Sequence, residues 1–355
     1  MTEFIKMINV KLLKETTQVP GAPGFEYRIR NFIKQNVKEL VDNVRIDAMG
    51  NLIAFRKGKS DKKLLISAHM DEISFVVTHI DEDGYIKFKT LGGFDPKTLT
   101  AQRVFIHGKE DIIGVMGTKP IHIMTPEERK KIPQIDDYYI DTGLDKKEVE
   151  LLVEIGNPIT RERSFIEMGG MVNSKSLDNR ICCYQMIETL NQLKDKELPM
   201  DVYAVFTVQE EIGLRGATAV ASGVNPDYVI NLDVTLACDV PGSMPHERIT
   251  DLGKGAAIKV LDGATVCDYR MVSFMKEVAN KNSIPFQLEV LPKGGTDTAG
   301  LQRHANGGSV AGGISIPCRY LHQVIEMASK KDLEGGINLL SECILEIGTY
   351  NWAHK

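Results

Sequence analysis

Three apolar stretches of this 355-residue chain each stop within two residues of a histidine or an acidic residue. They occupy 64–68, 202–208 and 227–232 and are rich in β-branched residues. Continuous apolar runs of this length are typical of strands buried on both faces of a mostly parallel sheet. A fourth run at 309–315 has the same character and precedes His322. Because the carboxyl ends of parallel strands meet at one edge of a sheet, the sequence predicts a polar cluster there.

The residues predicted to form this cluster carry the donor types of a metal site. Several carboxylates in one partly buried pocket disfavour each other's ionisation, so a cation must lie among them. No run of Lys or Arg accompanies the strand ends. Mixed imidazole and carboxylate donors suit Zn²⁺, Co²⁺ or Mn²⁺, and one bridging carboxylate would let five donors hold two ions with a shared water. The candidate ligands are His69, Asp178, Glu211, Asp233 and His322.

Two further acids lie beside the candidate ligands. Glu210 precedes Glu211, and in extended backbone their side chains point to opposite sides, so one can bind metal while the other faces substrate. A glutamate beside a metal-bound water can act as general base and then as general acid. Asp71 follows His69 by two residues, which suits a carboxylate that fixes the imidazole tautomer. Asp178 is the least distinctive candidate, since SLDNR is equally typical of a helix N-terminus.

Six short motifs, taken together and in order, resemble one known family. AHMDE, SLDNR, VQEEIGLRGA, NLDVT, KGGTDTAG and RYLHQ are similar to those of the tetrahedral (TET) aminopeptidases, a dinuclear family also labelled glutamyl aminopeptidases or cellulase-M-like proteins. The similarity covers nearly the whole chain. It implies that Asp178 bridges two metals, that Glu211 and His322 complete one site, and that His69 and Asp233 complete the other.

The resemblance also implies catalytic and substrate-binding residues. Glu210 would be the general base that acts on a metal-bridging water, and Asp71 would orient the neighbouring histidine. Gly295, Thr296 and Asp297 would lie near the substrate. The expected activity is a metal-dependent aminopeptidase that removes the N-terminal residue from short peptides, with two divalent ions per subunit, Zn or Co.

The order of patterns predicts an α/β fold in which a mostly parallel sheet carries the metallopeptidase site and an all-β domain is inserted. An early amphipathic helix around 25–40 is followed by two strands near 44–48 and 51–56. Short strands and turns then dominate, beginning with a hairpin over 75–90. We expect a discontinuous catalytic domain, 1–71 and 166–355, and an inserted β-rich dimerisation domain, 72–165.

Assembly is expected from the resemblance alone. It implies dimers, formed through the insert, that build a hollow tetrahedral dodecamer with its active sites facing inward. The segment 121–133 is hypothesised to be a long loop that borders a neighbouring subunit's site.

Composition excludes several other classes. A net charge of −5 and a pI near 6.0 argue against a nucleic-acid partner. No run of about 18 apolar residues indicates a membrane span. The N-terminal stretch lacks the uninterrupted core of a signal peptide, and the six cysteines show no CxxC spacing, so a cytoplasmic location with reduced thiols is expected.

Three alternatives remain open on sequence grounds. A related dinuclear carboxypeptidase or deacylase would use nearly the same ligands. The cellulase label raises an endoglucanase, although such enzymes need two carboxyl groups about 5–10 Å apart and no metal. A binding protein that kept an inherited metal site is the non-enzymatic reading. The preferred N-terminal side chain is not decided by the sequence; candidate determinants are Arg248, Lys254, Asp262, Asp268 and Arg270.

The glycine pairs are expected to form turns, because neither a P-loop nor a GxGxxG motif is present. The remaining histidines are scattered in predicted hairpins, loops or the C-terminal tail, so ordinary structural roles are expected for them as well. These histidines are His79, His107, His122, His246, His304 and His354.

Overall fold

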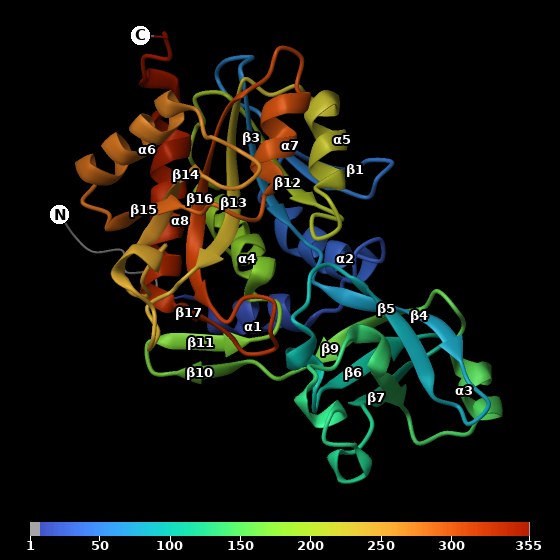
Figure 1. Ribbon diagram of the computed structural model, residues 1–355. Helices are drawn as coiled ribbons and strands as arrows, with labels where there is room; N and C mark the ends of the chain where they lie inside the picture. Colours follow the sequence, from blue (N-terminus) through green and yellow to red (C-terminus); the bar gives the residue numbers. More distant parts are fainter. Residues whose placement is uncertain (1–7, 355) are drawn as a thin grey trace.

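The computed structural model describes residues 8–354 and contains one large sheet covered by helices and one closed barrel (Figure 1). The sheet has eleven strands in the described residues, and its central strands run parallel in the order β12-β3-β13-β16. The flanking strands pair antiparallel with their neighbours, except for β15, which runs parallel to β14. The sheet strands are β1 (Asn43–Ile46), β2 (Leu52–Arg56), β3 (Lys63–His69), β10 (Ile166–Met168), β11 (Met171–Ser174), β12 (Asp201–Thr207), β13 (Tyr228–Leu236), β14 (Ala256–Leu261), β15 (Phe286–Val290), β16 (Val310–Arg319) and β17 (Glu326–Ser329).

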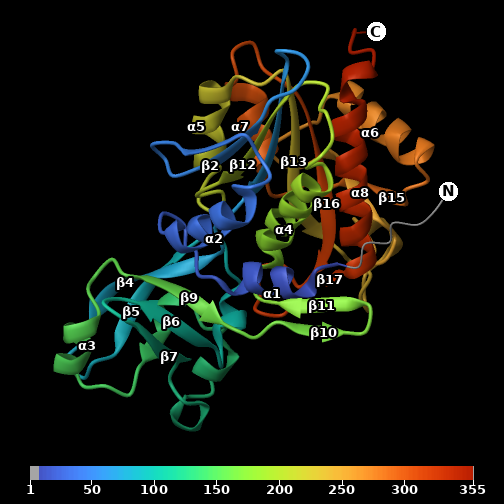
Figure 2. The same ribbon diagram turned by 180° about the vertical axis from the view of Figure 1, so that it is seen from behind.

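Helices cover both faces of this sheet, which explains why its central strands are apolar without alternation. Successive residues of β3 enter different cores: Leu64 and Ile66 pack with the helices of one face, and Leu65 packs on the other. Figures 1 and 2 show α5 and α7 on one face and α4, α6 and α8 on the opposite one. The helices are α1 (Val10–Gln18), α2 (Tyr27–Val37), α3 (Lys146–Leu152), α4 (Leu177–Gln192), α5 (Arg215–Val224), α6 (Tyr269–Lys281), α7 (Asp297–His304) and α8 (Lys330–Glu346).

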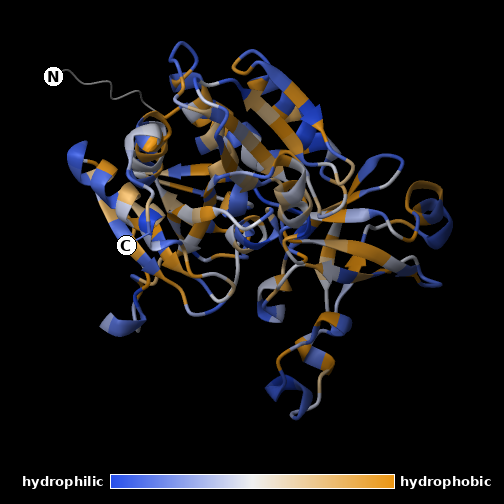
Figure 3. Cartoon of the chain, turned by 90° about the horizontal axis from the view of Figure 1, so that it is seen from above, coloured by the Kyte–Doolittle hydropathy of each residue, from blue (hydrophilic) through white to orange (hydrophobic). Residues whose placement is uncertain are grey.

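The second unit is a closed barrel with the strand order β4-β5-β8-β7-β6-β9. The barrel strands point Phe75, Val77 and Ile140 into a core of their own. Figure 3 shows apolar residues along the strands of both the sheet and the barrel. Closure removes the exposed edges that a small sheet would otherwise present. The barrel strands are β4 (Ser74–Ile80), β5 (Ile86–Leu91), β6 (Arg103–His107), β7 (Asp111–Gly117), β8 (Tyr139–Asp141) and β9 (Pro158–Glu162).

The long connection between β7 and β8 projects from the barrel (Figure 1). It contains three short 3₁₀ turns, η2 (Ile121–Ile123), η3 (Glu128–Lys130) and η4 (Ile135–Asp137). The remaining 3₁₀ turns are η1 (Pro96–Leu99), η5 (Pro245–Glu247) and η6 (Ile347–Thr349).

The strand assignments made from sequence correspond to β3, β12, β13 and β16, with one instructive difference. The apolar run at 227–232 predicts a strand that ends before Asp233, whereas β13 continues to Leu236. It continues because β16 pairs with it as far as Cys318, so hydrogen bonding outlasts the apolar pattern. Asp233 therefore projects from inside a strand.

A buried ionic cluster fixes the chain just after β3. Glu72 accepts hydrogen bonds from Lys175 Nζ at 2.7 and 2.9 Å, and Ser176 also donates to it. Arg180 approaches the same carboxylate at 3.5 Å and donates to the Met70 carbonyl at 2.6 Å. Because burying an unpaired charge is costly, this cluster ties the start of α4 firmly to the end of β3.

Within residues 8–354, no helix is long and apolar enough to cross a membrane.

Candidate metal centre

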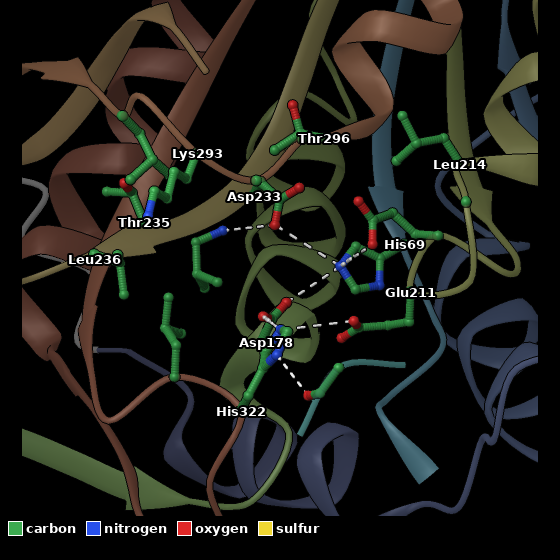
Figure 4. A pocket seen from close by; sticks show the side chains of 18 residues that line it. His69, Asp178, Glu211, Leu214, Asp233, Thr235, Leu236, Lys293, Thr296 and His322 are labelled. Carbon is green, nitrogen blue, oxygen red and sulfur yellow. Dashed lines mark hydrogen bonds and ion pairs between the residues drawn. The ribbon is translucent and has the colours of Figure 1, made fainter. Parts of the chain in front are cut away.

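The five candidate ligands lie together at the carboxyl edge of the parallel strands (Figure 4). His69 is the last residue of β3, and Asp233 projects from β13. Asp178 stands at the start of α4, where the backbone is not yet helical. The other two come from loops: Glu211 follows β12, and His322 lies between β16 and β17.

Asp178 occupies the middle of the cluster. Its Oδ1 lies 3.2 Å from His69 Nε2, and its Oδ2 lies 3.4 Å from His322 Nε2. Each oxygen of one carboxylate therefore faces a different imidazole. His69 Nε2 is also 3.8 Å from Asp233, and His322 Nε2 is 3.6 Å from Glu211.

The adjacent glutamates face different parts of the cluster. β12 ends at Thr207, so both glutamates lie in the loop that leads to α5. Glu210 lies 3.9 Å from His69 Nε2 and forms a group of possible metal donors with His69 and Asp233. Glu211 instead groups with His69 and Asp178. The side chains of Glu210 and Glu211 thus point to different places, as expected for extended backbone, although both residues lie in a loop.

Asp71 holds this glutamate loop by its backbone. Its Oδ1 accepts the N–H of Glu210 and its Oδ2 accepts the N–H of Glu211, each at 3.1 Å. His69 Nδ1 lies 3.5 Å from Asp71 Oδ1 and 3.2 Å from the Asp71 carbonyl oxygen. Asp71 therefore orients both the histidine before it and the glutamates far along the chain.

Gln209, the residue before Glu210, is also held by a hydrogen bond from its backbone N–H to a carboxylate. The carboxylate of Glu26, at the start of α2, accepts the N–H of Gln209 at 3.1 Å, and Gln209 has a positive φ of 55°. Two buried carboxylates thus hold three successive amides. A backbone conformation that is unfavourable for a non-glycine residue persists when surrounding contacts fix it, and such residues cluster at functional sites.

The carboxylates are under-neutralised. Burial, together with the charge of Asp178, raises the pKa of Glu211 to about 8 and that of Asp233 to about 7. Burial also raises the pKa of Glu210 well above its usual range. For His322, burial acts in the opposite direction, but the contacts with Asp178 and Glu211 raise the pKa to about 10. The carboxyl pKa values are thus raised first by burial and then by neighbouring carboxylates.

Tertiary structure does bring two cations near the cluster that the sequence pattern did not reveal. Arg161 arrives from the barrel, and Lys259 arrives from β14. Lys259 is already paired with Glu289 and lies 3.7 Å from Asp262. The positive charges of Arg161 and Lys259 therefore do not neutralise the carboxylates at the strand ends.

A divalent cation fits this donor set. Glu211 Oε1 is buried and has no hydrogen-bond partner among the described residues. Two overlapping groups of three donors have ligand atoms within 4.8 Å of one another, and both include His69. Imidazole nitrogens with carboxylate oxygens are the donors that Zn²⁺ and similar ions take in proteins.

A cavity of about 570 Å³ opens beside the cluster. Gly295 and Thr296 line it, as expected, whereas Asp297 lies behind the wall and receives a hydrogen bond from Thr207. Lys293 lines it too, and its side chain makes no ion pair with any of the described residues. None of the five specificity candidates from the sequence is among the lining residues.

Sequence reasoning missed several residues that contact the site. Glu326 accepts backbone N–H groups from two candidate ligands, and Arg161 donates to the carbonyl of one of them. No short motif marks either residue. His107, expected to have an ordinary role, is buried between Asp111 and Thr160, at 2.8 Å from each, and lies away from the cluster.

Comparisons with known proteins find aminopeptidases. The family model described as M42 glutamyl aminopeptidase matches residues 50–339. A putative aminopeptidase of Acetivibrio thermocellus is 40% identical, with 94% of this chain and 97% of that protein covered. A lysyl aminopeptidase of Pyrococcus furiosus is 35% identical, with 96% and 98% covered.

A solved structure of the Pyrococcus horikoshii TET1 peptidase, described as assembling into a tetrahedron or a large octahedral shell, has a TM-score of 0.86. It is 33% identical, with 95% of this chain and 99% of that chain covered. The aminopeptidase expectation is confirmed, and the carboxypeptidase, deacylase and endoglucanase alternatives are not favoured. This chain belongs to the M42 glutamyl aminopeptidase family, whose members are metal-dependent exopeptidases acting on peptides.

Proposed function

We propose that this chain is a dinuclear metallo-aminopeptidase of short peptides. The observation that carries the proposal is the placement of Asp178 between two imidazoles, one facing each carboxylate oxygen. In this arrangement Asp178 would be the ligand shared by two divalent ions, Zn or Co. Glu211 and His322 would complete one site, and His69 and Asp233 would complete the other.

The chain's own groups supply proton transfer and positioning. Bound divalent ions lower the pKa of a shared water and polarise the scissile carbonyl. The Glu210 carboxylate takes the proton of the attacking water and delivers it to the nitrogen of the leaving amine as the C–N bond breaks. This carboxylate lies 3.9 Å from His69 Nε2, beside the proposed ligands, which supports this role. Asp71 keeps the Glu210 peptide in place throughout.

The cavity beside the cluster receives the N-terminal side chain. Gly295 and Thr296 form part of its wall, and Asp297 supports the wall from behind. With metal bound, the site and one of its acids would hold the free α-amine of the substrate, so a substrate without that amine should not be turned over.

We propose the domain division 1–71 with 166–355 for catalysis and 72–165 for dimerisation. The barrel strands between Ser74 and Glu162 have a separate core, which supports the division. The shell-forming relative supports assembly of dimers into a dodecamer. All six cysteines are unpaired, in keeping with a reducing cytoplasm. Light scattering of the purified protein tests the assembly.

The decisive experiment compares three substrates: a free short peptide, its N-acetylated form and its C-terminally amidated form. We expect turnover of the free and amidated peptides, none of the acetylated one, and loss of all turnover after chelation. Equal cleavage of the acetylated peptide would overturn the aminopeptidase reading, and chelator-insensitive turnover would overturn the metal requirement.

A further inference from the structure

We infer that Glu326 and Arg161 are positioning residues that hold the peptide groups of His322. Through His322 they control metal binding in the half of the site that His322 shares with Glu211. This inference rests on the proposed function. It assigns to the barrel, which contributes Arg161, a direct part in forming the metal site.

Glu326 links two proposed ligands that are far apart in sequence. It begins β17, and 1% of its surface is exposed. Its Oε1 accepts the backbone N–H of His322 at 3.0 Å, and its Oε2 accepts the backbone N–H of Asp178 at 2.9 Å. One buried carboxylate therefore sets the spacing between the peptides of the proposed bridging ligand and a terminal ligand.

Arg161 holds the other side of the same residue. It lies on β9 of the barrel and is 2% exposed. Its Nη1 donates to the carbonyl oxygen of His322 at 3.1 Å, and its guanidinium group faces the ring of Phe94 at 5.5 Å. Burial lowers the pKa of Arg161, and Glu326 is the first of the acidic groups that oppose this shift. The barrel thus reaches the peptide of a proposed ligand through a buried cation.

A third contact fixes the imidazole itself. His322 Nδ1 lies 3.0 Å from the carbonyl oxygen of Gly93, in the loop that follows β5. A carbonyl can only accept, so Nδ1 donates to it and Nε2 is the nitrogen directed towards the other proposed ligands. Figure 4 shows the imidazole of His322 turned towards Asp178 and Glu211. The N–H, the carbonyl and Nδ1 of His322 are all held, which leaves Nε2 free to ligate.

His322 needs this support more than His69 does. The side chain of His69 is 2% exposed and belongs to the last residue of a regular strand, whereas that of His322 is 40% exposed and comes from a loop. His322 also has a positive φ of 61°, a conformation unfavourable for a residue with a Cβ. Contacts from Glu326 and Arg161 are what the structure provides to maintain it. The Glu211–His322 half should therefore lose metal first when either contact is removed.

The test is a metal titration of Glu326→Gln and Arg161→Gln against the wild type. Glutamine keeps one acceptor oxygen but turns an NH₂ group towards the second N–H, so one of the two bonds is lost. Metal-free protein is titrated with Co²⁺, and stoichiometry and affinity are followed by calorimetry and by the visible absorption of bound Co²⁺. We expect the wild type to bind two equivalents of Co²⁺. In each variant the affinity for one of the two should fall by roughly 10–100-fold, as is typical when a group that orients a metal ligand is removed.

Asp332→Asn is the matched control. Asp332 is also fully buried and also accepts two backbone N–H groups, those of Gly253 and Gly255 at 2.7 and 2.8 Å, outside the metal cluster. It should lose stability without changing either Co²⁺ affinity. Arg161→Lys, which keeps a cation able to reach the carbonyl, should recover part of the weakened affinity.

The outcomes separate this inference from the proposed function. If folded Glu326→Gln and Arg161→Gln each bind two equivalents of Co²⁺ with wild-type affinity, the positioning role is overturned. If Glu326→Gln does not fold, Arg161→Gln decides alone, and its wild-type affinities would be the contrary result. A wild-type protein that binds fewer than two equivalents would instead contradict the dinuclear centre itself.

Discussion

Asp71 and Glu210 are joined by a hydrogen bond in which the backbone N–H of Glu210 donates to the Asp71 carboxylate over 3.1 Å. The second oxygen of the same carboxylate accepts the next N–H, that of Glu211, at the same distance. A fully buried carboxylate thus fixes the direction of both glutamates. Asp71, which lies two residues after His69 in the sequence, therefore also holds the loop that carries the two glutamates.

Replacing Asp71 by Asn should impair catalysis more than metal binding. The amide retains one acceptor oxygen, so one glutamate N–H loses its partner and the loop relaxes. We expect kcat to fall by about 10–100-fold, the usual effect of removing a group that orients catalytic residues. Steady-state kinetics with elemental analysis of the same samples provide the measurement. Wild-type kcat in a fully metallated Asp71→Asn protein would contradict the role.

Glu210→Gln should retain metal and lose activity. The amide fills the same space but cannot take a proton from water, and loss of a general base costs typically about 10²–10⁴-fold in rate. The expected result is unchanged metal content with kcat reduced in that range. Glu197→Gln is the control, because Glu197 is an exposed partner of Lys59 and should leave kcat unaltered. A loss below about tenfold would require another base.

Asp178→Asn should empty the site as well as inactivate it. Asp178 faces both His69 and His322, and an amide can offer one oxygen where two are used. Burial opposes ionisation, yet the contacts with both imidazoles keep the pKa of Asp178 well below its usual range, so the native group is an anion. Elemental analysis after dialysis should find less than one ion per subunit. Retention of two ions would remove Asp178 from the bridging position.

Acid should weaken the fold through Glu72. Burial opposes its ionisation, but Lys175 and Arg180 lower its pKa from 4.5 to about 2. Because the folded pKa is below the unfolded one, the stabilisation is complete above pH 4.5 and is lost as the pH falls towards 2. The shift corresponds to about 3 kcal/mol.

Thermal unfolding between pH 6 and pH 2 measures this contribution. Glu72→Gln should be less stable at pH 6, since it leaves Lys175 and Arg180 without their buried partner. It should also lose less stability than the wild type on acidification. Parallel curves for the two proteins would show that Glu72 does not carry the acid sensitivity.

The sequence by itself determined which segments would be central strands and which donors would stand near their ends. The apolar runs that became β3, β12, β13 and β16 are visible locally because burial on both faces leaves no polar alternation. A histidine at the end of one run and acids near the ends of two others define donor chemistry before any fold is known. The motif order adds the family, which the comparisons confirmed.

Only the tertiary structure decided how those donors are held. Asp178 lies between His69 and His322, Glu326 joins Asp178 to His322, and the barrel supplies Arg161. These contacts join segments that are distant along the chain, and no local periodicity records them. The physical reason is that hydropathy patterns encode whether a side chain is buried, whereas hydrogen-bond partners depend on the register and packing of whole elements.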